Sequence, residues 1–334
     1  MKTLFYDIKK LELDYLLENP IKEIEPYFFK NSINPHTYID EKNLNAEALS
    51  VFVTSELNKE VLSRFKDLKF IFLRSVGYSN VDLEYCKNKG IQVFNTPNYG
   101  NSTVAEYVFS LLLTLSKKII QAKNSILEGE IEQEKLSGIE LFSKTMGVIG
   151  AGAIGRKVIN IAHGFGMSVL VYDINKNGAY NFVELDELLK KSDFISINCP
   201  LNDKTKKLID EIALSKMKRN AIIINCARGE IIDTQALYYA LIEKKIKGAA
   251  LDVIECEEYL CHNWKKCSKN IAFKSQCLKK FFYIQKMLQL PNVLITPHNA
   301  YNTKEATNRI IKITKENISS TFDLKYGAKN MVLI

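Results

Sequence analysis

Three side chains that could act together on a substrate, Arg228, Glu257 and His298, each follow a short apolar run. An arginine binds a carboxylate through two parallel hydrogen bonds and polarises an adjacent ketone. A histidine can donate a proton to the ketone oxygen, and a carboxylate on its other ring nitrogen favours the charged imidazole. Taken singly, the three could be a helix-end salt bridge, a solvated loop acid and a capping histidine. Together at one sheet edge, where ligands bind in α/β folds, they indicate chemistry on a 2-keto acid.

A glycine-rich motif supplies the matching cofactor signature. Gly150, Gly152 and Gly155 form G-x-G-x-x-G between an apolar strand pattern and an apolar helix pattern. Asp173 ends the next strand pattern, 18 residues beyond Gly155. The motif suits a diphosphate at a helix N-terminus, and the acid suits both ribose hydroxyls while repelling a 2′-phosphate. The sequence therefore predicts an NAD site rather than an NADP site; the alternative is a glycine-rich packing turn without a ligand.

The elements that must position these residues alternate between short strand patterns and longer helix patterns, which is typical of α/β units around parallel sheets. Six strands are expected in the C-terminal two thirds: 146–149, 168–172, 194–198, 221–225, 249–253 and 293–296. Four are expected near the N-terminus, with helices at 58–65 and 82–89 between them: 4–7, 49–54, 70–74 and 91–94. The predicted fold class is α/β, with two lobes that each hold a doubly wound parallel sheet.

A long helix pattern beginning near Ser102 or Thr103, either of which could cap it, runs to about Ile119 and suits a connector between two lobes. A last amphipathic helix, 304–322, could cross back onto the first lobe. We therefore expect a discontinuous substrate domain of residues 1–99 and 300–334, with an NAD-binding Rossmann domain of residues 100–299 inserted between its parts.

These motifs, in this order, resemble the D-isomer-specific 2-hydroxyacid dehydrogenase family. The further landmarks are Arg74-Ser-Val-Gly77, Asn95-Thr-Pro97, Ala227-Arg-Gly229, Leu251-Asp-Val253 and Thr296-Pro-His298. The likeness covers nearly the whole chain. It is greatest to the D-lactate dehydrogenase branch, including the form associated with glycopeptide resistance. The resemblance implies a flavodoxin-like substrate domain, a homodimer with its contact on the long helix, and NAD-dependent reduction of a small 2-keto acid.

Carried over residue by residue, the resemblance makes Arg228 the substrate-binding arginine and His298 the proton donor paired with Glu257. It places the substrate carboxylate at the backbone of Val76 and Gly77. Tyr99 and Tyr301 are expected on the substrate side, and Phe52 or Val53 facing the substrate side chain. Besides the glycines and Asp173, the residues expected to line the dinucleotide are Ala153, Ile154, Cys199, Pro200, Thr205, Cys226 and Asp252.

Some positions depart from the family pattern and leave alternatives open. Asn198 replaces a histidine common before the proline, and Asn299 and Asn302 are unusual after the catalytic histidine. These departures bear on cofactor packing and substrate preference. Pyruvate is the first expectation, a bulkier branched or aromatic 2-keto acid is the alternative, and a non-enzymatic NAD-sensing corepressor is a second class of function.

The composition argues against nucleic-acid-binding, membrane-spanning and secreted classes of protein. The chain has 334 residues and a net charge of +8, which could indicate nucleic acid or a membrane surface as partner. Residues 256–290 alone hold seven lysines against two glutamates, so the charge is mostly a local, solvated feature. The chain start lacks a signal-peptide pattern and no apolar run could span a bilayer, so we expect a cytoplasmic protein.

The seven cysteines favour reduced thiols over a disulfide framework. Four of them lie at 256–290, a segment that also holds the single tryptophan. Their spacing lacks any C-x-x-C pair, so we expect a surface excursion without a metal site. The four are Cys256, Cys261, Cys267 and Cys277, and the segment also contains His262 and Trp264.

Overall fold

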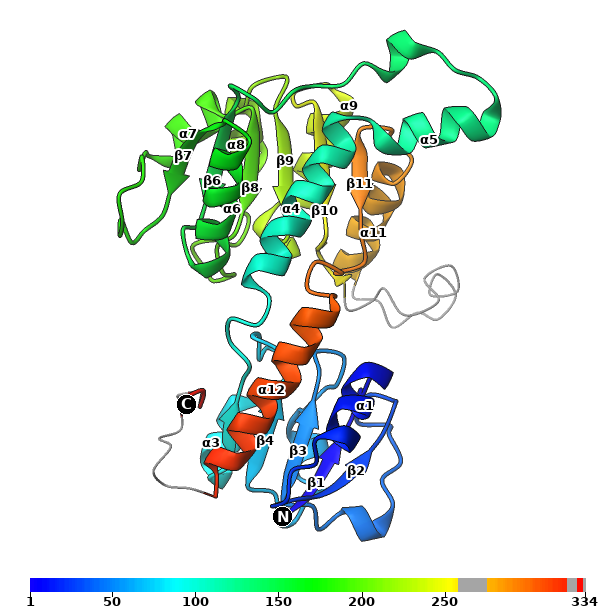
Figure 1. The fold of residues 1–334 in the computed structure, drawn as a ribbon, viewed down its shortest axis with the longest axis vertical. Coiled ribbons are helices and arrows are strands. Elements are labelled where there is room, and N and C mark those ends of the chain that lie inside the picture. The colour runs from blue at the N-terminus through cyan, green and yellow to red at the C-terminus, as the bar shows by residue number, and fades with distance from the viewer. Residues whose placement is uncertain (258–274, 323–328, 333–334) are drawn as a thin grey trace. The chain divides into compact units, whose positions relative to one another are not determined.

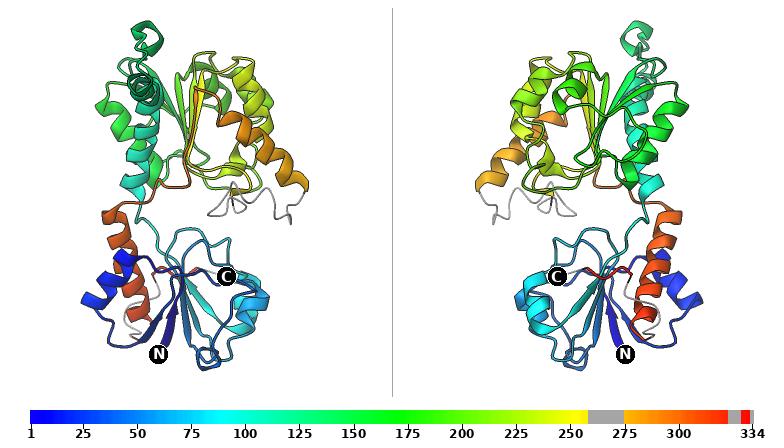
Figure 2. Two further views of the ribbon diagram at one scale, coloured as in Figure 1. Left: turned by 90° about the vertical axis from the view of Figure 1, so that its right-hand side faces the viewer. Right: turned by 90° about the vertical axis from the view of Figure 1, so that its left-hand side faces the viewer.

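The computed structural model of the chain describes residues 1–257, 275–322 and 329–332. It forms two compact units, Met1–Tyr99 with Asn302–Ile334 and Gly100–Tyr301. Each unit holds a parallel sheet with helices on both faces (Figures 1 and 2), which confirms the predicted fold class. In the described parts of the chain, none of the helices combines the length and apolar character that crossing a bilayer requires.

The first unit contains a five-stranded sheet in the order β2-β1-β3-β4-β5, the flavodoxin-like arrangement. Every neighbouring pair is parallel. The strands are β1 (Lys2–Phe5), β2 (Glu25–Phe28), β3 (Ala48–Val51), β4 (Phe70–Leu73) and β5 (Gln92–Phe94). The sequence analysis missed β2 because it is a half-exposed edge strand that contains Pro26, and it lacks the apolar run of the central strands.

Helices on both faces make this sheet a buried layer. Helices α1 (Lys10–Glu18) and α12 (Lys304–Ser320) cover one face, where Ile311 and Ile318 pack with Phe5, Phe72 and Phe94. Short helices α2 (Lys59–Leu62) and α3 (Leu83–Lys89) cover the other. A 3-10 turn, η1 (Glu41–Asn43), precedes β3.

The second unit contains the six expected strands in one parallel sheet, in the order β11-β10-β9-β8-β6-β7. They are β6 (Thr145–Ile149), β7 (Ser168–Tyr172), β8 (Phe194–Ile197), β9 (Ile222–Asn225), β10 (Gly248–Leu251) and β11 (Val293–Ile295). A parallel bridge from Val171 to Phe182 extends the sheet beyond β7. The strand order reverses beside β6, and the crevice at such a switch point is where dinucleotides bind.

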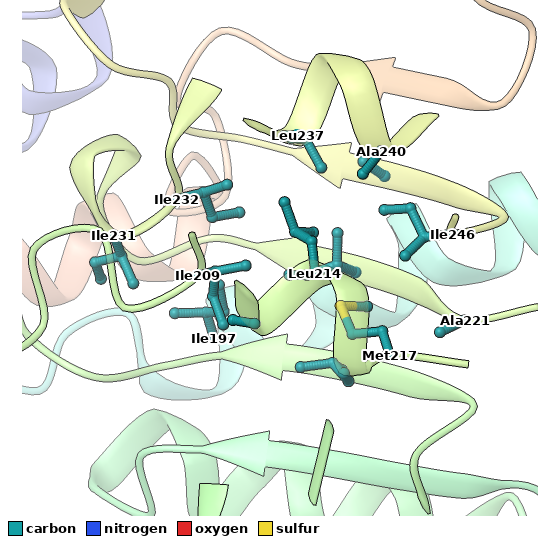
Figure 3. Packing of buried hydrophobic residues seen from close by; sticks show 14 of the residues in the cluster. Ile197, Ile209, Leu214, Met217, Ala221, Ile231, Ile232, Leu237, Ala240 and Ile246 are labelled. Carbon is teal, nitrogen blue, oxygen red and sulfur yellow. The ribbon is translucent and has the colours of Figure 1, made fainter. Parts of the chain in front are cut away.

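The strands of this unit are apolar at nearly every position because both faces are covered. In β9, Ile223 points to one core cluster while Ile222 and Ile224 point to the other. Figure 3 shows part of the first cluster, which includes Ile197 of β8 together with Leu214 and Met217. Its helices are α7 (Leu185–Lys191), α8 (Glu211–Lys216), α9 (Thr234–Ile242) and α11 (Ser275–Met287), and those of the opposite face are α4 (Asn101–Ser116) and α6 (Ala153–Gly164).

The expected connector helix is two helices. It begins at Asn101 with Gly100 as N-cap, so the prediction of a Ser102 or Thr103 cap is wrong. Thr103 is buried in the first turn and therefore lies inside the helix. The helix stops at Ser116 because Lys118 adopts a left-handed conformation, φ 51°, before α5 (Ile119–Glu128) begins. The short turns η2 (Gln133–Leu136) and η3 (Gly229–Ile231) complete the unit.

Cys256 and Cys277 form a disulfide, so the expectation of reduced thiols is wrong for this pair. The sequence separation of 21 residues hides the contact. Packing of α11 beside α9 brings the two Cα atoms to 5.9 Å, within the range of a disulfide. Cys86, Cys199 and Cys226 are free thiols. The expected surface excursion is wrong for α11 (Ser275–Met287), which packs Ile284 and Met287 into the core of the second unit. The predictions for Cys261, His262, Trp264 and Cys267 concern residues outside those that the structure describes.

Candidate active site

The glycine motif forms a backbone cradle between β6 and α6. Gly150 has φ +94°, and a Cβ there would lie 2.7 Å from the Cys199 nitrogen of the neighbouring strand end. A Cβ on Gly155 would lie 1.9 Å from the Gly150 oxygen, so both positions exclude a side chain. At Gly152, by contrast, no described atom lies within 4 Å of where a Cβ would stand, so a ligand can approach the backbone there.

The start of α6 is suited to an anion. Gly152 is its N-cap and provides no side-chain acceptor for the first amides of this 12-residue helix. The positive end of the helix dipole therefore faces the side that Gly152 leaves open. Ala153 and Ile154, predicted to line the dinucleotide, form the first turn.

Asp173 follows β7 with its carboxylate held toward the glycine loop. One oxygen accepts a hydrogen bond from the Ala151 N–H at 2.6 Å and the other from the Asn175 N–H at 2.7 Å. Each carboxylate oxygen has a second lone pair for a ribose hydroxyl. The glycine cradle, the uncapped helix start and this acid fit a dinucleotide without a 2′-phosphate.

The loop after β8 lines the side of the crevice opposite the glycine motif. The Thr205 hydroxyl donates to the Pro200 carbonyl at 2.7 Å and accepts from the Asn202 N–H at 2.8 Å, which closes the 200–205 loop. Burial, reinforced by the charge of Asp173, raises the pKa of the Cys199 thiol to about 11. Burial and then the charge of Asp252 raise the pKa of Cys226 well above its usual value.

These raised pKa values predict slow alkylation of Cys199 and Cys226. With a pKa near 11, about 0.1% of Cys199 is thiolate at pH 8, and only the thiolate reacts. Iodoacetamide labelling of the native protein, followed by peptide mass spectrometry, should therefore accelerate about tenfold per pH unit between pH 7 and 10. Urea-unfolded protein, in which both thiols recover ordinary values, is the control. A native labelling rate that levels off near pH 8 would contradict the assignment.

Arg228 stands after β9 on a loop whose main chain is fixed from two sides. The Asn225 side chain donates to the Arg228 carbonyl at 2.9 Å and accepts from the Ala227 N–H at 3.0 Å. A Cβ on Gly229 would lie 2.0 Å from the Ile254 carbonyl carbon, so only glycine allows the loop to rest on the segment after β10. The half-buried guanidinium donates to the Ala227 carbonyl at 2.6 Å.

Glu257 and His298 are brought together from the ends of β10 and β11. The His298 Nδ1 lies 2.9 Å from the Glu257 Oε1 although the two residues are 41 positions apart in the sequence. The side chain of His298 is 39% exposed and that of Glu257 is 32% exposed, so the pair is accessible from solvent. With Nδ1 engaged by the carboxylate, Nε2 is the nitrogen left for a substrate. The ring of Tyr301 lies edge-on to the imidazole, 6.3 Å between centroids.

Asp252, predicted to line the dinucleotide, also holds the loop that carries His298. Its buried carboxylate accepts from the Asn299 and Ala300 N–H groups at 2.9 and 2.8 Å, and from the Thr296 hydroxyl. The Asp252 carbonyl accepts from the His298 N–H at 2.8 Å. These bonds hold His298 in a left-handed conformation, φ 50°. Sequence reasoning missed this role, although an acid directly after a buried strand was a signal.

A second support lies behind Glu257. Glu255 is buried, accepts from the Thr234 N–H at 3.0 Å at the start of α9, and pairs with Lys280 of α11. Together with the Cys256–Cys277 disulfide it fastens the segment 252–257 to α11. Neither Glu255 nor Lys280 was singled out from the sequence.

Strand order places these groups side by side. Because β9, β10 and β11 are neighbours and parallel, Arg228, Glu257 and His298 leave the same edge of one sheet. The dinucleotide cradle lies at that edge too, after β6 and β8. The predicted substrate residues Val76, Gly77 and Tyr99 belong to the first unit, where Tyr99 is buried and its carbonyl accepts from Arg309 at 2.6 Å.

Comparison with known proteins agrees with this arrangement. Residues 109–300 match the family model "D-isomer specific 2-hydroxyacid dehydrogenase, NAD binding domain". The chain is 33% identical over 329 residues to D-lactate dehydrogenase kk1H of Curvularia clavata, covering 95% of this chain and 91% of that protein. It is 37% identical over 291 residues to an aromatic 2-oxoacid reductase of Clostridium sporogenes, covering 85% of each.

Among solved structures, the D-lactate dehydrogenase of Aquifex aeolicus complexed with NAD and lactic acid superposes with a TM-score of 0.86. The two share 35% identity, with 99% of this chain and 98% of that one covered. The sheet topology, the glycine cradle and the full-length likeness lead to one conclusion. The chain is a member of the D-isomer-specific 2-hydroxyacid dehydrogenase family, and its second unit is the NAD-binding domain of that family.

Proposed function

We propose that this enzyme reduces pyruvate, or another small 2-keto acid, to the D-2-hydroxy acid. The observation that carries the proposal is the 2.9 Å pairing of His298 with Glu257 at the sheet edge that also presents Arg228 and the dinucleotide cradle. NADH, when bound, supplies the hydride. The cradle of Gly150, Gly152 and Gly155 would hold its diphosphate and Asp173 its ribose.

The protein side chains would perform the remaining steps. The Arg228 guanidinium would bind the substrate carboxylate and polarise the ketone, and the Val76 and Gly77 amides would bind the same carboxylate. The His298 Nε2–H would donate its proton to the ketone oxygen as negative charge develops there. Glu257 would stabilise the imidazolium beforehand and fix which nitrogen faces the substrate. Tyr99 and Tyr301 are proposed to line the substrate side.

The choice of pyruvate rests on resemblance. Relatives that cover 90% or more of the chain include proteins named D-lactate dehydrogenase and a protein named glyoxylate reductase, and one that covers 85% is named an aromatic 2-oxoacid reductase. A bulkier branched or aromatic 2-keto acid is therefore the alternative substrate within the same chemistry.

A steady-state panel of 2-keto acids tests the proposal. Pyruvate, glyoxylate, 2-ketoisocaproate and phenylpyruvate would each be assayed with NADH and with NADPH. Pyruvate should give the highest kcat/KM, and NADH should exceed NADPH by about 100-fold because the Asp173 carboxylate repels a 2′-phosphate. Preference for phenylpyruvate would select the bulkier substrate. NADH binding without turnover of any 2-keto acid would reject the enzymatic proposal in favour of an NAD-sensing protein.

We also propose that the enzyme is a homodimer, joined beside the connector helices of the second unit. Helix α5 has no buried residue, and four of its apolar side chains are exposed: Ile119 (55%), Ile120 (42%), Ile126 (69%) and Leu127 (74%). In Figure 1 this helix extends outward from the end of α4. Such a surface is typical of a protein interface.

The double variant Ile126→Glu/Leu127→Glu should dissociate this dimer. Burying two unpaired carboxylates in an apolar interface is strongly unfavourable, so the dimer Kd should rise at least about 100-fold. Sedimentation equilibrium measures it, with Ser215→Glu as the control, because Ser215 is exposed on α8, which covers the sheet face opposite α4. A monomeric wild type, or a double variant that dimerises as well as the wild type, would contradict the proposal.

A further inference from the structure

The peptide between Val76 and Gly77 is held by the side chain of Asn95, the residue that directly follows β5. The Asn95 Nδ2 donates to the Val76 carbonyl at 2.9 Å, across from the end of β4. In a trans peptide the carbonyl and the following N–H point in opposite directions, so this bond also fixes the direction of the Gly77 N–H. The Ser75 hydroxyl fixes the next peptide in the same way by donating to the Gly77 carbonyl at 2.7 Å.

The amides on the opposite side of these peptides are left for a ligand. Within the described residues, none accepts a hydrogen bond from the Gly77 or the Tyr78 N–H, although both carbonyls before them are bonded. An amide whose carbonyl already accepts a hydrogen bond is polarised and becomes a better donor. The loop thus presents directed donors suited to a carboxylate.

Asn95 is itself braced by the C-terminal part of the first unit. Its N–H donates to the Asn330 carbonyl at 3.1 Å, and its carbonyl accepts from the Asn317 side chain at 2.8 Å. The Asn330 side chain then donates to the Asn317 Oδ1 at 2.8 Å. Asn317 is buried on α12, and a bridge between Phe94 and Met331 keeps the terminal segment beside β5. Asn317 and Asn330, more than 200 positions beyond Asn95 in the sequence, therefore support the residue that holds the loop.

We propose that Asn95 is a positioning residue for the substrate carboxylate, with Asn317 and Asn330 as its supports. This inference rests on the proposed function, in which the Val76 and Gly77 amides bind that carboxylate. Asn95 touches neither substrate nor cofactor. It orients the peptide whose N–H binds the carboxylate equally in the substrate and in the transition state, so its effect falls on KM rather than on kcat.

The test is the kinetics of Asn95→Ala. Loss of one orienting hydrogen bond should raise the KM for the 2-keto acid about 10-fold. The inhibition constant of oxamate, a pyruvate analogue that keeps the carboxylate, should rise by a similar factor. The kcat and the dissociation constant for NADH should stay within about twofold of wild type, because the variant leaves the NAD domain and the proton donor intact.

Two further variants keep the test decisive. Asn292→Ala is the matched control, because the Asn292 side chain donates to the Lys247 carbonyl at 2.8 Å in the other unit. It should leave every constant unchanged. If Asn95→Ala does not fold, Asn330→Ala removes only the outer support and should raise the KM about threefold.

The outcomes separate this inference from the proposed function. A folded Asn95→Ala with wild-type KM and oxamate inhibition would overturn the positioning role while the wild type still turns over 2-keto acids. A lower kcat and a weaker NADH affinity, each by about the same factor as the rise in KM, would also overturn it, since together they indicate general structural damage. A wild type that reduces no 2-keto acid would instead reject the proposed function, and this inference with it.

Discussion

Replacing His298 with alanine should lower kcat for the 2-keto acid about 10³-fold while leaving NADH binding unchanged. A positioned general acid contributes about 10² to 10⁴ in rate, and the Nε2 of His298 is the proton donor that the geometry provides. The NADH cradle lies at β6 and β8, which are separated from β11 in the sheet by at least two strands, β10 and β9, so cofactor affinity should not depend on the imidazole. Glu257→Gln should lower kcat less, about 10- to 100-fold, because the imidazole remains but its charged form loses its partner.

Steady-state assays and fluorescence titration with NADH measure both quantities. His163→Ala is the matched control, since His163 is an exposed histidine in the last turn of α6 in the same unit. A His298→Ala enzyme that keeps more than a tenth of the wild-type kcat would remove the proposed proton donor. Loss of NADH binding would show that His298 supports the fold of the site instead.

Replacing Arg228 with glutamine should lower kcat/KM about 10³-fold. Removing one partner of a desolvated, hydrogen-bonded charge pair costs about 2 to 5 kcal/mol, and the substrate carboxylate would lose both the charge and the paired donors. Arg228→Lys keeps the charge without the planar fork, so it should recover only part of the loss. The Asn225 bonds and the Gly229 contact hold the loop main chain in either variant.

The loss should be visible mainly as a raised KM, together with a lower kcat because the ketone is no longer polarised. Arg219→Gln, an exposed arginine before β9, is the control. Full activity of Arg228→Lys would contradict bidentate binding, and an unchanged KM in Arg228→Gln would contradict any contact with the substrate carboxylate.

The sequence predicted the fold where the physical signal is local. Central strands such as β8 and β9 are continuous apolar runs because both faces of the sheet are covered, and their positions were found within one residue. The edge strand β2 carries no such signal, because half of its side chains face solvent. The interruption between α4 and α5 was missed as well, since one left-handed lysine leaves no mark on the apolar pattern.

The residues of the candidate site also divide into those with a local sequence signal and those without one. The glycine cradle is a local motif, so the sequence alone predicts its conformation. Pairing of Glu257 with His298 was expected from their place after neighbouring strands and from family resemblance, not from a local pattern, because the two positions are 41 apart in the sequence and a helix and a strand lie between them. Other contacts of the site join residues that only tertiary folding brings together. They are the bonds from Asp252 to the His298 loop, the Cys256–Cys277 disulfide and the hydrogen bond from Asn95 to the Val76 carbonyl.

The central claim is that hydride and proton are added to a 2-keto acid to give the D-hydroxy acid. The direct measurement is one reaction of pyruvate with NADH deuterated at the transferred position of the nicotinamide, followed by chiral separation and mass spectrometry of the lactate. The expected product is D-lactate carrying one deuterium at C2. L-lactate, unlabelled D-lactate, or oxidation of the cofactor without lactate would contradict the account.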